Sequence, residues 1–300
     1  MIMSLISFQK LMNDAERHSY AVGYFEAWNL DSFLAVCNAA ENMKSPVIIG
    51  FSGIGFPGPD HFLKDIFDIY AKLINELASS LTVPACTIFN ESPSKDLVQK
   101  AIKQNLSIVM FQDPDLNCNE QESIIKELSS TAHKNNVAIE GAMETQAGLG
   151  KDIIDIPEKE LLTDIKAAKS FVEETGIDAF AVNIGQISLI SENKVRLNFG
   201  HLEKLKKEIG IPLVLHGGSS VYDEDIKKAI KLGIRKINIG KAVKEAYLKT
   251  LRKSCSEIKD YNPYKLIGSG LEHDILIKAR ISMQKTVEEL MILFGSVGKK

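Results

Sequence analysis

The segment at residues 211–220, Ile-Pro-Leu-Val-Leu-His-Gly-Gly-Ser-Ser, joins a short apolar run to side chains that can do chemistry. An apolar run with Pro before it and Gly after it is typical of a buried parallel strand. His216 follows the strand directly, Gly217 lets the backbone bend close to a ligand, and Ser219 offers a hydroxyl group. In barrels of alternating strands and helices, residues just past a strand's carboxyl end carry the chemistry. The segment therefore predicts a site that contains His216.

The segment from Arg235 to Lys241, Arg-Lys-Ile-Asn-Ile-Gly-Lys, has the same design. A strand is followed by small polar and basic residues, and a helix is expected to start at Lys241. Barrels often bind phosphate after strands seven and eight, where a helix N-terminus also favours an anion. These two consecutive strand ends therefore predict a site for a phosphate group.

The composition narrows the class of protein. The chain has 300 residues, of which 45% are hydrophobic and 25% charged, as in an ordinary globular protein with a large core. The net charge is -3, the isoelectric point is near 6.1 and no basic block occurs, so we expect no nucleic-acid partner. No apolar run approaches the ~20 residues that span a membrane, and the N-terminus lacks the pattern of a signal peptide. We therefore expect no membrane partner.

The four cysteines are scattered along the chain, at Cys37, Cys86, Cys118 and Cys255. No Cys-x-x-Cys pair occurs among them. Scattered cysteines of this kind indicate reduced thiols, and we therefore expect a cytoplasmic protein.

Eight strand-like runs alternate with helical segments. Strands are expected over residues 20–25, 46–51, 83–89, 106–111, 137–142, 177–184, 211–215 and 234–239. Helices are expected over residues 4–17, 30–42, 60–79, 120–135, 157–175, 201–209, 223–232, 241–255 and about 275–293, and one more runs from Ser94 or Asp96 to Gln104. Regular alternation favours a (β/α)8 TIM barrel over an open sheet. We expect one domain over residues 1–300, with a linker near Asn262–Pro263 and a helical extension over about 263–300.

Three carboxylates fall at expected strand ends. Glu26 closes the first strand, Glu91 follows the third and Glu140 lies in the fifth. If they meet at the barrel mouth, neighbouring carboxylates raise one another's pKa and supply an acid/base group. The alternative is that they point to separate places.

Several motifs together resemble the class II, ketose-bisphosphate aldolases, which include the fructose- and tagatose-bisphosphate aldolases. They are Tyr20-Ala-Val-Gly-Tyr-Phe, Lys44-Ser-Pro-Val-Ile-Ile, Asp178-Ala-Phe-Ala-Val-Asn-Ile-Gly, Ile211-Pro-Leu-Val-Leu-His-Gly-Gly-Ser and Lys236-Ile-Asn-Ile. The resemblance covers nearly the whole chain. It implies a TIM barrel, a dimer or tetramer, and cleavage of phosphorylated ketoses with a zinc ion held by three histidines.

The resemblance breaks down at the metal site. Where the family's third strand ends in His-Leu-Asp-His-Gly, this chain has Ile88-Phe-Asn-Glu-Ser. The proton-transferring Asp thus becomes Asn90, which is no acid or base at neutral pH, and one zinc ligand becomes Glu91. The second histidine falls at Ser188, and only the third, His216, is kept. His216 and Glu91 are therefore the remaining candidate ligands for a divalent metal.

Other site positions of the family are only partly kept in this chain. The family's metal-associated acids fall at Gln112 and Ala142, whereas the neighbouring acid Glu140 is kept. The family's glycine after the second zinc histidine falls at Leu189. Candidate catalytic residues are therefore Asn90, Glu91 and Glu140.

The phosphate end is better preserved. Gly217, Ser219 and Asn238 match phosphate-contacting positions of the family. Lys241 stands where the family has Thr, and a lysine serves a phosphate as a point charge.

Three hypotheses for function stay open. The first is an aldolase-like carbon–carbon lyase for a phosphorylated or anionic ketose, with a rebuilt metal and acid/base site. The second is an inactive barrel that binds a sugar phosphate or a partner subunit, with His216 an inherited hydrogen-bonded histidine. The third is a metal-free enzyme that uses carboxylates, or Lys241 as a Schiff-base amine.

Overall fold

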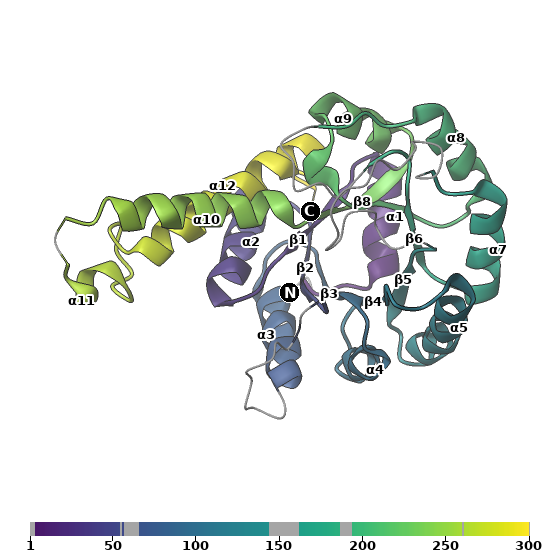
Figure 1. The fold of residues 1–300 in the computed structure, drawn as a ribbon, viewed down its shortest axis with the longest axis horizontal. Helices are drawn as coiled ribbons and strands as arrows, with labels where there is room; N and C mark the ends of the chain where they lie inside the picture. Colours follow the sequence, from purple (N-terminus) through teal and green to yellow (C-terminus); the bar gives the residue numbers. More distant parts are fainter. Residues whose placement is uncertain are drawn as a thin grey trace.

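A closed barrel of eight parallel strands forms the centre of the molecule (Figure 1). The computed structural model describes residues 4–54, 56, 66–143, 162–186, 194–259 and 261–299. The strands pair in chain order, and β1 also pairs with β8. They are β1 Val22–Glu26, β2 Val47–Ser52, β3 Ala85–Ser92, β4 Ile108–Phe111, β5 Ala138–Gly141, β6 Ala179–Val182, β7 Leu213–Leu215 and β8 Ile234–Ile239. The expected TIM barrel is confirmed.

Helices alternate with the strands and surround the barrel (Figure 1). They are α1 Phe8–His18, α2 Leu30–Met43, α3 Ile66–Ser80, α4 Lys95–Lys103, α5 Cys118–Lys134, α7 Ile165–Thr175, α8 Phe199–Glu208, α9 Asp223–Lys231, α10 Lys241–Ser256, α11 Pro263–Leu266 and α12 Ile275–Phe294. Between β7 and α9 lies a short 3-10 helix, η1, over Gly218–Ser220. No helix among the described residues is long and apolar enough to cross a membrane.

Two apolar cores hold the barrel together. One fills the inside of the barrel, where α1 contributes Phe8, Leu11 and Met12, and Tyr24 and Ile48 come from strands. The other lies between the barrel wall and the outer helices. Because side chains alternate along a strand, most strands supply both cores, which explains their nearly continuous apolar sequences, whereas β8 supplies only the outer core. Further along the strands the interior becomes polar, and the candidate site begins there.

The last helices form an arm that projects from the barrel (Figure 1). Helices α10 and α12 pack along each other, and α11 lies at the far end. The linker expected near Asn262–Pro263 is wrong, because this segment starts α11. Asn262 caps that helix by accepting a hydrogen bond from the Tyr264 backbone N–H, and Pro suits the first helical turn.

Several boundaries differ from those expected. The first helix starts at Phe8, because Ser7 caps it and Leu5 pairs with Ala85 of β3. Within the helix expected over residues 157–175, α7 covers Ile165–Thr175, and Asp164 caps it. The expected starts of the helices at residues 60 and 157, and Ser188 and Leu189, lie outside the described residues.

Candidate active site

The end of β3 is irregular, and this irregularity places two site residues. The pairing of β3 with β4 shifts between Phe89 and Ser92, so β3 holds one more residue than its partner there. Glu91 has a φ of 48°, a left-handed conformation that is unusual for a residue with a side chain. A bulge re-aims side chains that would otherwise point to opposite faces. The expected boundary at Phe89 is therefore wrong, because Asn90 and Glu91 lie inside the strand.

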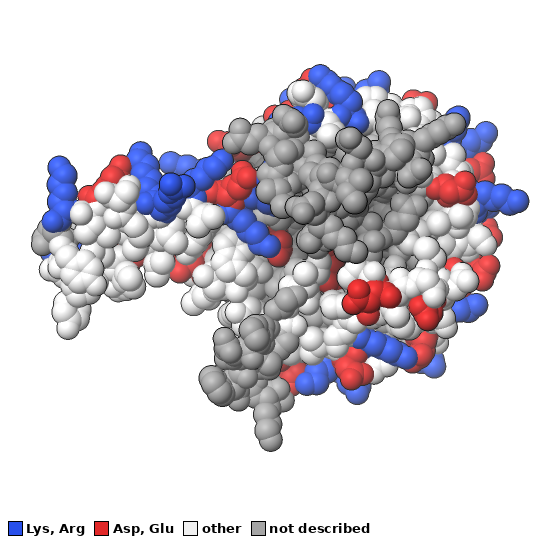
Figure 2. Space-filling model, viewed as in Figure 1, with Lys and Arg blue, Asp and Glu red and all other residues white. Residues whose placement is uncertain are grey.

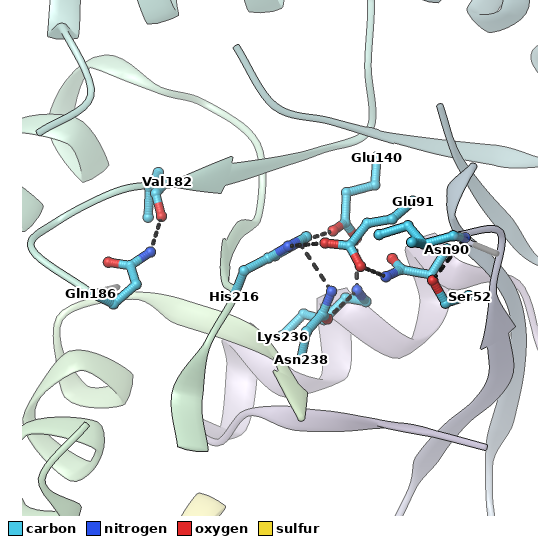
Figure 3. Close-up of polar contacts among 10 residues, drawn as sticks. Ser52, Asn90, Glu91, Glu140, Val182, Gln186, His216, Lys236 and Asn238 are labelled. Carbon is cyan, nitrogen blue, oxygen red and sulfur yellow. Dashed lines mark hydrogen bonds and ion pairs between the residues drawn. The ribbon is translucent and has the colours of Figure 1, made fainter. Parts of the chain in front are cut away.

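His216 follows β7 and lies between two carboxylates (Figure 3). Its Nδ1 is 3.1 Å from Glu91 Oε1, and its Nε2 is 2.7 Å from Glu140 Oε1. Asn238 Nδ2 lies 3.0 Å from the same Nε2. The structure thus unites four residues that the sequence proposed for separate reasons.

Lys236, which the sequence analysis did not single out, lies beneath this group. Its Nζ is 2.7 Å from Glu140 Oε2 and donates to Asn238 Oδ1 at 2.5 Å (Figure 3). The ammonium also faces the ring of Tyr24, 5.3 Å from its centroid. Lys236 and Asn238 are two residues apart in β8, so both point into the barrel. We call Glu91, Glu140, His216, Lys236 and Asn238 the mouth cluster.

The mouth cluster consists of buried charges that balance one another. Burial alone would raise the pKa of Glu140, but Lys236 and His216 outweigh it and lower that pKa to about 2. Burial alone would lower the pKa of His216, but its contacts with Glu140 and Glu91 raise it to about 9. Burial lowers the pKa of Lys236, and Glu140 opposes that shift. These contacts favour the charged forms of Glu140 and His216, and Glu140 favours the ammonium form of Lys236.

Asn90 provides a buried hydrogen-bond acceptor. Its side chain is 2% exposed, and its Nδ2 donates to Glu91 Oε2 at 2.8 Å. A carboxylate only accepts, so this bond fixes which atom of the amide is nitrogen. Asn90 Oδ1 has no hydrogen-bond partner among the described residues. A buried polar atom of this kind calls for a donor, such as a ligand hydroxyl or a water molecule.

The expected phosphate residues lie at the ends of β7 and β8. Gly217 adopts a φ of 65°, the left-handed conformation that glycine tolerates best, and starts η1. Ser219 Oγ accepts a hydrogen bond from the Ala242 backbone N–H at 3.3 Å, within the first turn of α10. Lys241 is the first residue of α10, and its ammonium lies 3.9 Å from Glu245. The structure thus gathers Ser219 and Lys241 at the α10 N-terminus, while Asn238 points into the mouth cluster.

The three strand-end carboxylates do not form one group. Glu91 and Glu140 flank His216, as described above. Glu26 instead pairs with Lys244 of α10 at 2.7 Å. In the loop after β6, Gln186 donates to the backbone oxygen of Val182 at 2.5 Å (Figure 3). Its amide is therefore bound to the end of β6 and does not contact His216.

A zinc ion held by protein ligands does not fit the described residues. Zinc sites use about three or four protein ligands. Glu91 and Glu140 contact opposite nitrogens of the His216 ring, so a single ion bound by that ring can take only one of them. Within the described ranges, no three His, Cys, Asp or Glu side chains are grouped to hold a metal ion. His216 and Glu91 are therefore at most two of the ligands that a zinc ion needs.

Metal content tests this conclusion. We expect protein dialysed against metal-free buffer to keep far less than one zinc ion per chain, because a two-ligand site binds weakly. Plasma mass spectrometry of the wild type and of His216→Ala measures this directly. One zinc ion per wild-type chain, lost in His216→Ala, would contradict the conclusion and show that residues outside the described ranges complete a site.

The left-handed backbone of Glu91 predicts an unusual order of stabilities. Glu91→Gly and Glu91→Ala both remove the carboxylate, but only glycine adopts a φ of 48° without steric cost. We expect Glu91→Gly to be more stable than Glu91→Ala by about 1 kcal/mol, measured as the free energy of unfolding in urea. Equal stabilities, or a more stable Ala variant, would contradict the strain at this position.

The fold and the site together indicate the class of protein to which this chain is related. A parallel barrel with acid/base side chains at the carboxyl ends of its strands has the architecture of the TIM-barrel enzymes. The sequence model of the family described as fructose-bisphosphate aldolase class-II matches residues 6–299. The chain belongs to this family.

Individual relatives agree over nearly full length. A fructose-bisphosphate aldolase of Geobacillus stearothermophilus is 31% identical over 301 residues, covering 99% of this chain and 99% of the relative. A 6-phospho-5-dehydro-2-deoxy-D-gluconate aldolase of Bacillus subtilis is 30% identical, covering 99% and 98%. The crystal structure of the YdjI aldolase from Escherichia coli K12 has a TM-score of 0.78 at 27% identity, covering 98% of this chain and 99% of that one. The resemblance read from the motifs is confirmed.

Proposed function

We propose that this protein is an aldolase-like carbon–carbon lyase that acts on a phosphorylated or otherwise anionic ketose through a remodelled site. The observation that supports this proposal most strongly is the position of Glu91. This carboxylate lies at the barrel mouth against one ring nitrogen of a histidine, and the other ring nitrogen faces a buried carboxylate. Family membership supports the reaction class. The relatives named for fructose bisphosphate and for 6-phospho-5-dehydro-2-deoxy-D-gluconate support a phosphorylated substrate.

The reaction needs a base and a stabilised anion. In aldol cleavage a base takes the proton of the hydroxyl on the carbon β to the ketone. That carbon becomes the aldehyde, the bond between the α and β carbons breaks, and its electron pair passes into the ketone as an enolate. A proton then returns to the α carbon. The groups on this chain must therefore exchange one proton and offset one negative charge.

The mouth cluster offers a group for each task. Glu91 is the most exposed member, with 15% side-chain exposure against 4% for His216, and we assign it as the base. Glu140 keeps His216 charged, and this positive charge beside Glu91 offsets the enolate. We assign Asn90 Oδ1 to accept a hydrogen bond from a substrate hydroxyl, because that buried atom lacks a partner among the described residues.

The strand ends of β7 and β8 supply the anion end of the proposed site. Gly217, Ser219, Asn238 and Lys241 would contact a phosphate through backbone N–H groups, a hydroxyl, an amide and an ammonium. The location of Ser219 Oγ beside the first turn of α10 supports this arrangement, because a helix N-terminus favours negative charge.

A substrate panel tests the proposal. Ketose monophosphates and bisphosphates are incubated with the enzyme in deuterium oxide, with and without added zinc, and scored for aldehyde release and for deuterium uptake at the α carbon. Deuterium uptake detects enolate formation even when no aldehyde leaves. Turnover of any panel member supports the proposal, and absence of both signals across the panel would overturn it. Borohydride reduction in the same samples tests a Schiff base, and no adduct at Lys241 would remove that version.

A second function is favoured by one observation. Both ring nitrogens of His216 are already engaged by carboxylates, so this residue is satisfied as a structural histidine. An aldolase-like barrel that binds a sugar phosphate or a partner subunit without turnover would have such a site. Binding of a panel compound in calorimetry, with neither aldehyde release nor deuterium uptake, would favour this function over the lyase.

We further propose that the chain forms a dimer or tetramer through its projecting arm, with a second copy as the occupant. In Figure 2 one edge of the arm carries basic side chains and the other edge mostly uncharged ones. Large apolar side chains are exposed on α10, α11 and the turns beside α11, and Tyr264 is 89% exposed. They are Leu248, Tyr261, Tyr264, Ile267 and Leu271. An exposed apolar face of this kind is typical of an interface between copies.

Light scattering after gel filtration tests the arm. We expect the wild type to elute as a dimer or tetramer and the variant Tyr264→Ser/Leu271→Ser to elute as a smaller species. Ile69→Ser is the matched control, because Ile69 is an exposed apolar residue on α3, away from the arm. A monomeric wild type at micromolar concentration would contradict the proposal.

We also propose a cytoplasmic location. All four cysteines are free, and Cys37 and Cys86 are buried, which suits a reducing compartment. Cell fractionation measures the location, and recovery of the protein outside the cytoplasm would contradict it.

A further inference from the structure

The ammonium of Lys236 is held from several sides inside the barrel. The residue is 0% exposed and contacts Glu140 Oε2, Asn238 Oδ1 and the ring of Tyr24. An ammonium group has three donors and no acceptor, so it attracts only oxygen atoms and ring faces. The three donors of Lys236 are matched by Glu140, Asn238 and the Tyr24 ring, so any functional effect of this residue passes through a neighbour.

Asn238 is the neighbour whose behaviour depends on Lys236. A side-chain amide has an accepting oxygen and a donating nitrogen, and rotation by about 180° exchanges them. The 2.5 Å contact with Lys236 admits only the oxygen, because an amide nitrogen would place its donors against the ammonium. The nitrogen therefore faces the other way, where it lies 3.0 Å from His216 Nε2 (Figure 3).

We propose that Lys236 is a positioning residue that fixes the amide of Asn238 with its N–H face toward the barrel mouth, so that the end of β8 donates to a ligand oxygen. The value of this orientation for binding rests on the proposed function, in which Asn238 contacts an anionic substrate. The orientation itself follows from two contacts: the Nε2–H of a charged His216 is already donated to Glu140 Oε1, so the amide oxygen of Asn238 is left to the Lys236 ammonium. A neutral apolar side chain at position 236 removes the preference, and the amide then turns toward whichever partner is nearer.

The test compares two variants that differ only at position 236. Glu140→Gln keeps an oxygen for Lys236, and Lys236→Met/Glu140→Gln removes the ammonium without leaving an unpaired buried carboxylate at position 140. Protein labelled with 15N-asparagine gives side-chain amide signals, and Asn238→Asp assigns the pair from Asn238. We expect one sharp, slowly exchanging pair in the wild type and in Glu140→Gln. In Lys236→Met/Glu140→Gln that pair shifts, broadens and exchanges faster.

Ligand affinity is measured on the same proteins with inorganic phosphate as the probe. We expect phosphate to bind Lys236→Met/Glu140→Gln about tenfold more weakly than Glu140→Gln, since roughly one hydrogen bond to a charged group is lost. Lys236→Gln keeps a donor toward Asn238 Oδ1, and we expect it to restore both the amide signals and the affinity.

The outcomes separate this inference from the proposed function. Unchanged Asn238 signals in Lys236→Met/Glu140→Gln would overturn the positioning role. Changed signals with unchanged phosphate affinity would support the positioning role and count only against Asn238 as a phosphate ligand. If Lys236→Met/Glu140→Gln does not fold, Lys236→Leu/Glu140→Gln and Lys236→Gln/Glu140→Gln are compared instead. Equal Asn238 signals in these two would again overturn the proposal, because only the glutamine at position 236 can donate to Asn238 Oδ1.

Discussion

Glu140→Met should lower the free energy of unfolding by about 3–5 kcal/mol, a large effect for one substitution. Glu140 is fully buried and is the carboxylate that both Lys236 and His216 contact, at 2.7 Å each. Methionine fills a similar volume but leaves the Lys236 ammonium without a carboxylate in a part of the barrel that water does not reach. Urea unfolding followed by circular dichroism measures the loss.

The control for this prediction removes both charges. Lys236→Met/Glu140→Met has no unpaired ammonium, and replacing both members of a buried ion pair by apolar groups is often nearly neutral. We therefore expect the second substitution to recover most of the stability lost in Glu140→Met. If the two losses simply add, the pair is not coupled and the charge assignment of the mouth cluster is wrong.

Much of the barrel could be predicted because its strands are buried on both faces. Strand β8 occupies Ile234–Ile239, as expected, since three isoleucines recur in a short segment that ends before Gly240. His216 lies directly after β7 for the same reason. Asn29 caps α2, because Ser32 completes a capping box with it.

The bulge in β3 could not be predicted from periodicity. Alternation along a strand assigns Asn90 and Glu91 to opposite faces, which would send one of them away from the site. The extra residue and the left-handed φ of Glu91 change that assignment. Such a feature depends on the pairing of β3 with β4 and leaves no pattern in a single sequence.

Lys236 is a site residue that the sequence did not indicate. Lysine is almost never fully buried unless it is paired, so a lysine in a strand suggests an exposed position. One signal was available, because Lys236 and Asn238 are two residues apart in one strand and must share a face. The partner, Glu140, comes from β5, and the sequence predicts only an acid/base role for it. Its role as a counter-ion follows from a contact with a residue of another strand, which a single sequence does not reveal.

The gathering of carboxylates was predicted only in part. Glu91 and Glu140 meet at His216, whereas Glu26 pairs with Lys244, which lies 218 residues away in the chain. Strand order in a barrel brings β1 beside β8, so Glu26 faces the start of α10 instead of His216. Chain order alone would have indicated this neighbour, since β8 and α10 are consecutive.

Glu91→Gln should reduce the rate of aldol cleavage by at least about 100-fold, the loss typical when a positioned acid/base group is removed. The reason is chemical, because glutamine keeps the shape of the side chain but cannot take a proton. We expect the free energy of unfolding to change by only about 1 kcal/mol, since the contact with His216 Nδ1 can persist. The measurement is kcat and deuterium uptake with the best substrate of the panel.

Glu26→Gln is the matched control for this last prediction. Glu26 is also a strand-end carboxylate, but it pairs with Lys244 and does not contact His216. We expect Glu26→Gln to change kcat less than about threefold, because its contact is an exposed ion pair of small energy. If Glu91→Gln keeps the wild-type kcat, or if Glu26→Gln loses as much, Glu91 is not the base. The base would then be an Asp or Glu residue outside the mouth cluster. The positive charge on His216 would act without the carboxylate beside it.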